Sequence, residues 1–194
     1  MKKNIAVYAG TFDPVTNGHL DIIERASRMF DTLYVTICIN PNKQGLFSID
    51  ERKELLKAAC QQFDNVIIDS SDKLSVEYAK DVGSRIIVRG IRATMDFEYE
   101  LQLAFSNQYL DKEVDMVFLM TKPSHSFISS SAVKEMVSHN RSVEGLVPPC
   151  VESDLRKKYP GEYIFPFLYG KIIVKITYFC YNVKRKKTMS TGYN

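Results

Sequence analysis

Apolar residues occur in short runs, without strict alternation of apolar and polar positions, and these runs are separated by longer stretches of helical spacing. The runs cover residues 5–9, 33–39, 66–68, 86–88 and 114–120, and the helical stretches about 17–30, 48–62, 75–83, 96–110 and 129–139. Apolar runs of this kind are typical of strands buried on both faces of a parallel sheet. The pattern therefore predicts an α/β fold, a doubly wound, Rossmann-like five-stranded parallel sheet flanked by helices.

Two further signals refine this organisation. Ser48 and Glu51 have the spacing of a capping box, which predicts that the second helix starts there. Residues 1–158 are expected to form one domain, and residues 159–194 a C-terminal extension of different character. The extension contains a possible strand at 172–181 and a basic cluster at 184–187. That cluster could touch a membrane surface or nucleic acid, or belong to a solvated tail.

Polar segments follow the predicted strands where a parallel sheet binds its ligands. In open α/β sheets this place is the carboxyl edge, so segments distant in sequence should converge there. These segments are residues 10–19, 40–43, 89–92 and 121–131.

The first of these segments is a glycine-rich turn between a strand and a helix. Backbone N–H groups at such a turn and at a helix N-terminus bind anions, and Gly10 and Gly18 allow close approach of the main chain. His19, in the first helical turn, could stabilise charge on a transferring phosphate. A lone histidine at a helix start can also be structural, but Thr11 and Asn17 beside it favour the phosphate site.

Two arginines follow the fourth predicted strand. Arg89 and Arg92 could grip two phosphates through bidentate hydrogen bonds, and Gly90 between them suggests a tight turn at the sheet edge. In the alternative interpretation, both arginines form surface ion pairs with the acidic residues that follow them, Asp96, Glu98 and Glu100.

Two more segments offer groups that bind phosphate. Lys43 lies in a polar loop after the second strand, a natural place for a cation that meets a substrate phosphate. Ser129, Ser130 and Ser131 open a helix, where hydroxyl and N–H groups can hold an anion or simply cap the helix.

Several classes of chemistry find no support. The sequence has no P-loop, no G-x-G-x-x-G, no nucleophile elbow and no clear covalent nucleophile, which favours direct displacement between two bound phosphorylated substrates. The net charge of +3 does not argue for nucleic acid. The four cysteines have no metal-like spacing, and Cys38 and Cys60 are expected in the core. No signal peptide is evident, so the cytoplasm is the expected compartment.

Taken together, these segments resemble the bacterial phosphopantetheine adenylyltransferases, of the nucleotidyltransferase superfamily marked by an H/T-x-G-H turn. The resemblance spans about residues 5–158 and rests on residues 10–14, 16–19, 89–92 with 96–100, and 126–131. It implies transfer of AMP from ATP to 4′-phosphopantetheine, which gives dephospho-coenzyme A and pyrophosphate, with Mg²⁺. It also implies a catalytic domain at 1–158 and a homohexamer. From the sequence itself, no nucleic acid or membrane partner is expected, and no carboxylate cage for the metal is evident, so Mg²⁺ is expected on the ATP phosphates.

The resemblance assigns roles by position. His19 would stabilise the transition state, and Lys43 and Arg92 would share in catalysis. The phosphopantetheine site would contain Thr11, Lys43, Ser75 and Arg89. The ATP site would contain Thr11, Phe12, His19, Gly90, Ile91, Arg92, Glu100, His125, Ser126, Phe127, Ile128, Ser129, Ser130 and Ser131.

The chain departs from the family at several positions. Ala9 stands where the family usually has proline, and His125 where tryptophan or tyrosine is common. The segment from about residue 160 has no counterpart in the family. Two alternatives stay open: a related nucleotidyltransferase that uses nicotinamide mononucleotide or glycerol 3-phosphate, and a nucleotide-binding module without catalysis.

Overall fold

A computed structural model describes residues 3–39 and 44–160 of the chain. Lys43 and the predicted strand and basic cluster of the C-terminal extension lie outside these residues.

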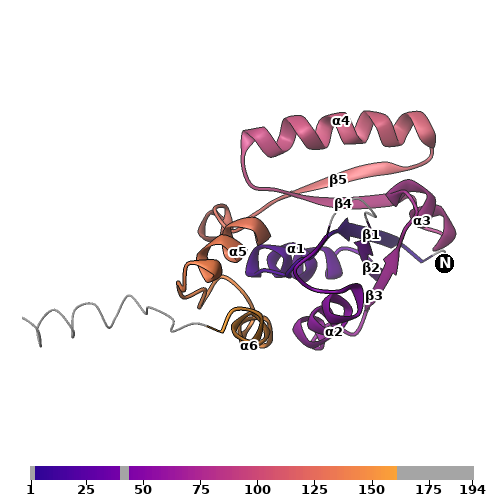
Figure 1. Cartoon of the computed structure of the whole chain (residues 1–194). Coiled ribbons are helices and arrows are strands. Elements are labelled where there is room, and N and C mark those ends of the chain that lie inside the picture. The colour runs from indigo at the N-terminus through magenta and orange to yellow at the C-terminus, as the bar shows by residue number, and fades with distance from the viewer. Residues whose placement is uncertain (1–2, 40–43, 161–194) are drawn as a thin grey trace, which may run out of the picture.

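A parallel sheet of five strands forms the centre of the molecule (Figure 1). Its strands are β1 (Ile5–Gly10), β2 (Thr32–Cys38), β3 (Val66–Ser71), β4 (Ile86–Ile91) and β5 (Asp115–Met120). They lie in the order β3-β2-β1-β4-β5, and every pairing is parallel. The chain thus moves outward from β1 through β2 to β3, returns to β4 beside β1, and moves outward again. The predicted doubly wound fold is confirmed, and its topological switch point lies between β1 and β4.

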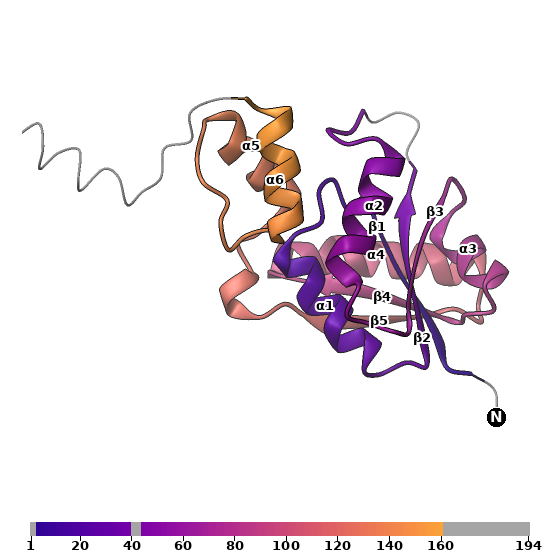
Figure 2. The same ribbon diagram turned by 90° about the horizontal axis from the view of Figure 1, so that it is seen from below.

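Helices cover both faces of the sheet. The helices α1 (Asn17–Ser27) and α2 (Ile49–Cys60) lie on one face, and α3 (Ser75–Asp81) and α4 (Thr94–Leu110) on the other (Figures 1 and 2). The helices α5 (Ser130–Ser138) and α6 (Pro149–Lys158) lie together at one end, and α6 packs against α2.

Alternation along β1 explains the two layers of the core. Ala6 and Tyr8 pack on the α1 and α2 side, whereas Val7 and Ala9 pack on the α3 side. All four are buried, because β1 is the central strand and has helices over both faces. This pattern is what the uninterrupted apolar run predicted.

The structure corrects the expectation at Gly90. Gly90 lies inside β4, paired with Leu119 of β5, so no tight turn occurs there. A Cβ atom at this position would approach Cγ1 of Ile22 to 3.0 Å, so glycine lets α1 pack closely on the strand. The sequence analysis also missed α6 and a short 3-10 turn, Pro123–His125.

In the described ranges, no helix combines the length and the apolar character needed to cross a membrane.

Candidate active site

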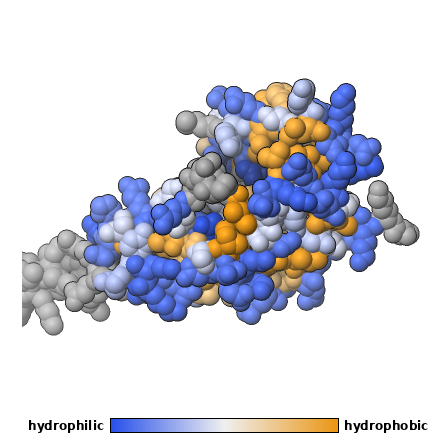
Figure 3. Space-filling view, turned by 45° about the vertical axis from the view of Figure 1, so that its right-hand side comes forward, coloured by the Kyte–Doolittle hydropathy of each residue, from blue (hydrophilic) through white to orange (hydrophobic). Residues whose placement is uncertain are grey.

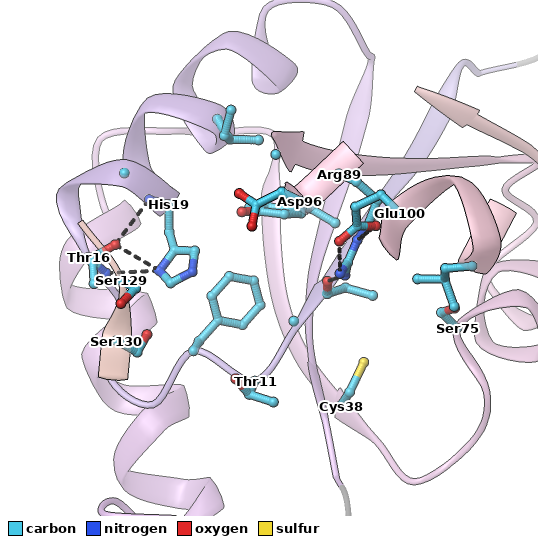
Figure 4. Close-up of a pocket in the computed structure, with 18 of the residues that line it drawn as sticks. Thr11, Thr16, His19, Cys38, Ser75, Arg89, Asp96, Glu100, Ser129 and Ser130 are labelled. Carbon is cyan, nitrogen blue, oxygen red and sulfur yellow. Dashed lines mark hydrogen bonds and ion pairs between the residues drawn. The ribbon is translucent and has the colours of Figure 1, made fainter. Parts of the chain in front are cut away.

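A cavity of about 740 Å³ opens at the carboxyl ends of β1, β2 and β4 (Figure 4). The residues that line it come from segments far apart in sequence, from Tyr8 to Ser130. The cavity therefore sits at the switch point of the sheet, as expected for a doubly wound fold.

The β1–α1 turn holds its shape through Phe12 and Thr16. Phe12 has a φ of +44°, a left-handed conformation that is uncommon for a bulky residue. Its side chain is 1% exposed and makes edge-to-face contacts with the rings of Tyr8 and His19. Thr16 caps α1 and takes part in a capping box with His19. The turn thus buries Phe12 and leaves Thr11 exposed at the cavity.

His19 is held as a neutral imidazole of defined tautomer. Its Nδ1 accepts a hydrogen bond from the backbone N–H of Thr16 at 3.0 Å, so the ring proton is on Nε2. Burial, together with the positive charges of Arg92 and Arg89, lowers the pKa of His19 to about 4. At neutral pH this residue is therefore an N–H donor in the wall of the cavity and not a cation.

Arg89 is fixed on β4 by three hydrogen bonds. Its Nε and Nη2 donate to the two carboxylate oxygens of Glu100 at 2.7 and 2.6 Å, and its Nη1 donates to the carbonyl oxygen of Ala9. The side chain of Glu100 is 8% exposed and that of Arg89 is 21% exposed, so this ion pair lies inside the cavity wall.

Arg92 lies between β4 and α4 and is held in a similar way by Asp96, one helical turn before Glu100 on α4. Its Nε and Nη2 donate to Asp96 at 2.9 and 3.1 Å, and its Nη1 donates to the carbonyl oxygen of Ile128. Two of the three acidic residues named in the ion-pair interpretation, Asp96 and Glu100, are thus partners of the arginines, but these pairs line the cavity and do not lie on an outer surface. The ion-pair interpretation is therefore correct in part, and the binding of phosphates by the two arginines stays a prediction.

The serine segment connects the turn to α5. Ser129 caps α5 and accepts from the N–H of Ala132, and the hydroxyl of Ser130 donates to the carbonyl oxygen of Pro14. Only these two of the three serines line the cavity.

Two buried carboxylates tie the elements around the cavity together. Asp13 accepts from the N–H groups of Leu46 and Phe47 at 2.9 Å each and pairs with Lys134 of α5. Burial opposes ionisation of Asp13, but the hydrogen bonds from Lys134, Phe47 and Leu46 outweigh it and lower its pKa.

Asp21 plays the same part on α1. Its side chain is 1% exposed and pairs with Lys122 Nζ at 2.8 Å, and it also accepts from the N–H of Lys122. Arg25 completes the link by donating to the carbonyl oxygen of Met120. The helix that carries His19 is thus joined to the loop after β5.

Most residues predicted for the site lie around this one cavity. Those that line it are Thr11, Phe12, His19, Ser75, Arg89, Gly90, Arg92, Glu100, Ile128, Ser129 and Ser130. Five other described residues were predicted for the site but do not line the cavity: Ile91, His125, Ser126, Phe127 and Ser131. Lys43 lies outside the described residues, so its place is not assessed.

The sequence analysis missed several lining residues. Cys38, expected in the core, lines the cavity, as do Asp72, Lys73, Leu74, Tyr99, Leu103 and Thr121. Thr121 and Cys38 could have been found from their places at the ends of strands. The sequence places Tyr99 and Leu103 in a predicted helix but does not mark them as site residues, because no local pattern shows which side of a helix faces a ligand.

Among the described residues, no group of three or more His, Cys, Asp or Glu side chains could hold a metal ion. The cavity carboxylates of Asp96 and Glu100 are bound to arginines.

Comparison with known proteins identifies the family of this chain. The cytidylyltransferase-like family model matches residues 7–136. A phosphopantetheine adenylyltransferase of Carboxydothermus hydrogenoformans is 49% identical over 158 residues, 81% of this chain and 98% of that protein. One of Clostridium novyi is 45% identical over 154 residues, 79% of this chain and 96% of that protein.

Solved structures support the fold. A putative nicotinate-nucleotide adenylyltransferase of Vibrio parahaemolyticus has a TM-score of 0.60 at 16% identity and covers 79% of this chain and 99% of its own. The nicotinic acid mononucleotide adenylyltransferase of Plasmodium falciparum, complexed with NaAD, has a TM-score of 0.59 at 18% identity and covers 81% and 96%. Because the family model matches residues 7–136 and the relatives are this similar along almost their whole length, the chain belongs to the cytidylyltransferase-like family and, within it, to the phosphopantetheine adenylyltransferases.

Proposed function

We propose that this protein transfers AMP from ATP to 4′-phosphopantetheine, with release of pyrophosphate and formation of dephospho-coenzyme A. The observation that carries the proposal is the identity of 45–49% to phosphopantetheine adenylyltransferases across nearly their full length. The cavity supports it, because two fixed arginines and a neutral N–H donor surround one space.

The reaction is an in-line displacement. An oxygen of the phosphopantetheine phosphate attacks the α-phosphorus of ATP, and the bond from that phosphorus to the bridging oxygen breaks, so pyrophosphate leaves with the electron pair. No strong base is needed, because a phosphomonoester is largely ionised at neutral pH with a second pKa of about 6. The protein mainly positions the reactants and stabilises charge.

The neutral His19 fits the charge that develops in this step. Its Nε2–H is free to donate to an oxygen of the transferring phosphate, because Nδ1 is already bonded to Thr16. A donor of fixed orientation needs no rearrangement as negative charge grows.

The two arginines would divide the substrates between them. Arg89, with Thr11, Ser75 and Lys43, would hold the phosphopantetheine phosphate end. Arg92 would hold ATP, and the remaining ATP contacts would come from Phe12, Gly90 and Ile91 and from residues 125–131. Supporting this division, Arg92 is bonded to Ile128 of that segment and Arg89 to the β1 end.

Mg²⁺ would accompany ATP. Because the cavity carboxylates of Asp96 and Glu100 are bound to arginines, phosphate oxygens of ATP would supply the main ligands. The ion neutralises part of the triphosphate charge when bound. We place the protein in the cytoplasm, with these small molecules and no nucleic acid or membrane as partners.

We also propose a homohexamer. Phe97, Tyr99, Phe105 and Tyr109 of α4 are 43%, 66%, 63% and 88% exposed. Figure 3 shows an apolar patch at the top of the molecule, in the region of α4. Exposed apolar patches of this kind commonly mark subunit contacts, so α4 is the expected interface.

An acceptor screen tests the reaction. Purified protein is incubated with ATP and Mg²⁺ and with phosphopantetheine, nicotinamide mononucleotide or glycerol 3-phosphate, and pyrophosphate release is measured. Release with phosphopantetheine alone is expected. Release only with another acceptor would show a related nucleotidyltransferase, and ATP binding without release in any mixture would show a non-catalytic module.

A further inference from the structure

The carbonyl group of Thr11 is held by a buried arginine of α2. Nη1 of Arg52 donates to this carbonyl oxygen at 3.3 Å, and Nε donates to the carbonyl oxygen of Phe47 at 2.8 Å. Nε also lies 3.3 Å from a carboxylate oxygen of Asp13, and the side chain of Arg52 is 9% exposed. Because the donors of a guanidinium have fixed relative directions, this one side chain joins the β1–α1 turn rigidly to the segment before α2.

Gly45 leaves the space that this guanidinium occupies. A Cβ atom at position 45 would lie 1.5 Å from Nη2 and 2.7 Å from Cζ of Arg52. The carbonyl oxygen of Phe47, 3.1 Å from the same point, limits the space on another side. Glycine is therefore needed here for the close approach of the arginine, and a side chain at this position would displace the end of Arg52.

The hydrogen bond to Thr11 also sets the direction of the peptide group between Thr11 and Phe12. This peptide is trans, so its C=O and N–H groups point in opposite directions. Thr11 and Phe12 line the cavity, as Figure 4 shows for Thr11, whereas Arg52 does not. With the C=O group directed to Arg52, the N–H of Phe12 is directed to the cavity. The left-handed φ of Phe12, +44°, is a conformation that persists only where neighbouring groups hold it.

The N–H of Phe12 is a buried donor without a partner in the described protein. Phe12 is 1% exposed and lies outside the helices and strands, and no described residue accepts a hydrogen bond from its N–H. Buried backbone N–H groups almost always have an acceptor. In the wall of a cavity that acceptor is a ligand atom, and a phosphate oxygen suits it best, because hydrogen bonds to charged acceptors are the strong ones.

We propose that Arg52 is a positioning residue for the nucleotide. Through the carbonyl of Thr11 it aims the N–H of Phe12 at a phosphate oxygen of ATP, and it touches no substrate itself. The identity of this ligand rests on the proposed function. The inference adds that α2, which contributes no residue to the cavity lining, contributes to nucleotide affinity.

Nucleotide binding and one amide resonance test the role of Arg52. Protein with isotope-labelled phenylalanine is titrated with the non-reacting α,β-methylene analogue of ATP, and the amide resonance of Phe12 is assigned by its loss in Phe12→Leu. In the wild type, this amide proton should move downfield at saturation. Arg52→Lys keeps the positive charge but has a single ammonium group. There the movement should decrease and the Kd should rise about tenfold, the scale of one lost hydrogen bond to a charged group.

Gly45→Ala tests the same interaction and leaves the arginine in the sequence. Its methyl group displaces the guanidinium, so the movement of the Phe12 resonance should decrease and the Kd should rise as in Arg52→Lys. In the Arg52→Lys background, Gly45→Ala should raise the Kd no further. An equal rise in both backgrounds would contradict the proposal. If Arg52→Lys does not fold, Gly45→Ala alone decides.

Two controls separate positioning from a general loss of stability. Arg85→Lys makes the same replacement at an arginine that is 60% exposed, before β4. Val151→Ala removes buried apolar atoms from α6, away from the cavity, and lowers the free energy of unfolding. Both variants should keep the wild-type Kd and the wild-type movement of the Phe12 resonance.

Two results would overturn the inference. One is a wild-type Phe12 amide resonance that does not move at saturation, and the other is a folded Arg52→Lys variant with the wild-type Kd and movement. Neither result concerns the acceptor, because phosphopantetheine is absent from these titrations. The expected resonance changes, together with no pyrophosphate release in the acceptor screen, would refute only the proposed reaction.

Discussion

His19 illustrates how a single side chain gains a defined chemical state from its neighbours. The N–H of Thr16 selects the tautomer, and burial with the charges of Arg92 and Arg89 disfavours the protonated form. The motif Thr16-Asn17-Gly18-His19 predicted a histidine at a phosphate site, and the structure adds that its ring is a neutral donor. This state suits a reaction in which negative charge increases on phosphate oxygens.

Replacement of His19 by alanine should leave the fold intact and lower kcat by about a hundredfold or more, the scale of one lost oxyanion donor. Steady-state kinetics of pyrophosphate release measure kcat, and circular dichroism checks the fold. His139→Ala, at an exposed position after α5, is the control and should retain wild-type kcat. A folded His19→Ala variant with near-normal kcat would refute the role of His19.

The titration of His19 gives a second expectation. Its ordinary pKa of 6.5 falls to about 4 in the folded protein, so between these values the unfolded chain binds more protons. The contribution of His19 to the free energy of unfolding is therefore complete above pH 6.5 and is lost as the pH falls from 6.5 to about 4. Proton NMR should follow the His19 ring resonance, assigned by its loss in His19→Gln, to a midpoint near 4. A midpoint near 6.5 would contradict the buried, neutral state.

At the scale of elements, helix starts and strand ends organise the site. The capping box at Ser48 is confirmed, and Ser129 caps α5, which is the alternative that the sequence offered for the serine segment. The contacts of Asp13 that join separate elements could not be predicted from local sequence, since its partners lie 33, 34 and 121 positions away. Such partners are set by packing of the turn, the β2–α2 loop and α5, and no local spacing reveals them.

Loss of the Asp13 anchor should destabilise the protein strongly. Asp13→Ala leaves Arg52, whose side chain is 9% exposed, and the N–H groups of Leu46 and Phe47 without their carboxylate. Urea unfolding should show a free energy of unfolding lower by about 3 kcal/mol, as for other broken buried pairs. Asp64→Ala, at an exposed turn, should change it by less than about 0.5 kcal/mol.

The difference in the free energy of unfolding between the wild type and Asp13→Ala should depend on pH. The pKa of Asp13 lies below 3.8 in the folded state despite its burial, because Lys134, Phe47 and Leu46 donate to it. Its stabilising contribution is therefore complete above pH 3.8 and decreases as the pH falls through the folded-state pKa. A wild-type advantage over Asp13→Ala that grows on acidification would exclude this account.

At the scale of the whole molecule, α4 has two different sides. Asp96 and Glu100 face the cavity and bind the arginines, whereas Phe105 and Tyr109 remain exposed. One helix thus connects the site with the surface proposed for assembly. The sequence predicted the helix but not this division, because apolar residues occur all around it.

Charged replacements on the exposed side of α4 should dissociate the proposed hexamer. The double variant Phe105→Glu and Tyr109→Glu places two carboxylates in the interface, where burial without partners is unfavourable. Light scattering coupled to gel filtration should give six chain masses for the wild type and a smaller assembly for the variant. Gln62→Glu, at an exposed position beyond α2, should keep the wild-type mass. A monomeric wild type would refute the hexamer itself.

The sequence by itself determined the strands, most helices, the doubly wound class and the family, because these depend on local apolar periodicity and short contiguous motifs. It also marked His19, Arg89, Arg92 and the serine segment. Only the tertiary structure decided the neutral tautomer of His19, the pairing of Glu100 with Arg89 and the strand position of Gly90. Those features depend on burial and on contacts between residues distant along the chain, which the folded sheet edge brings together.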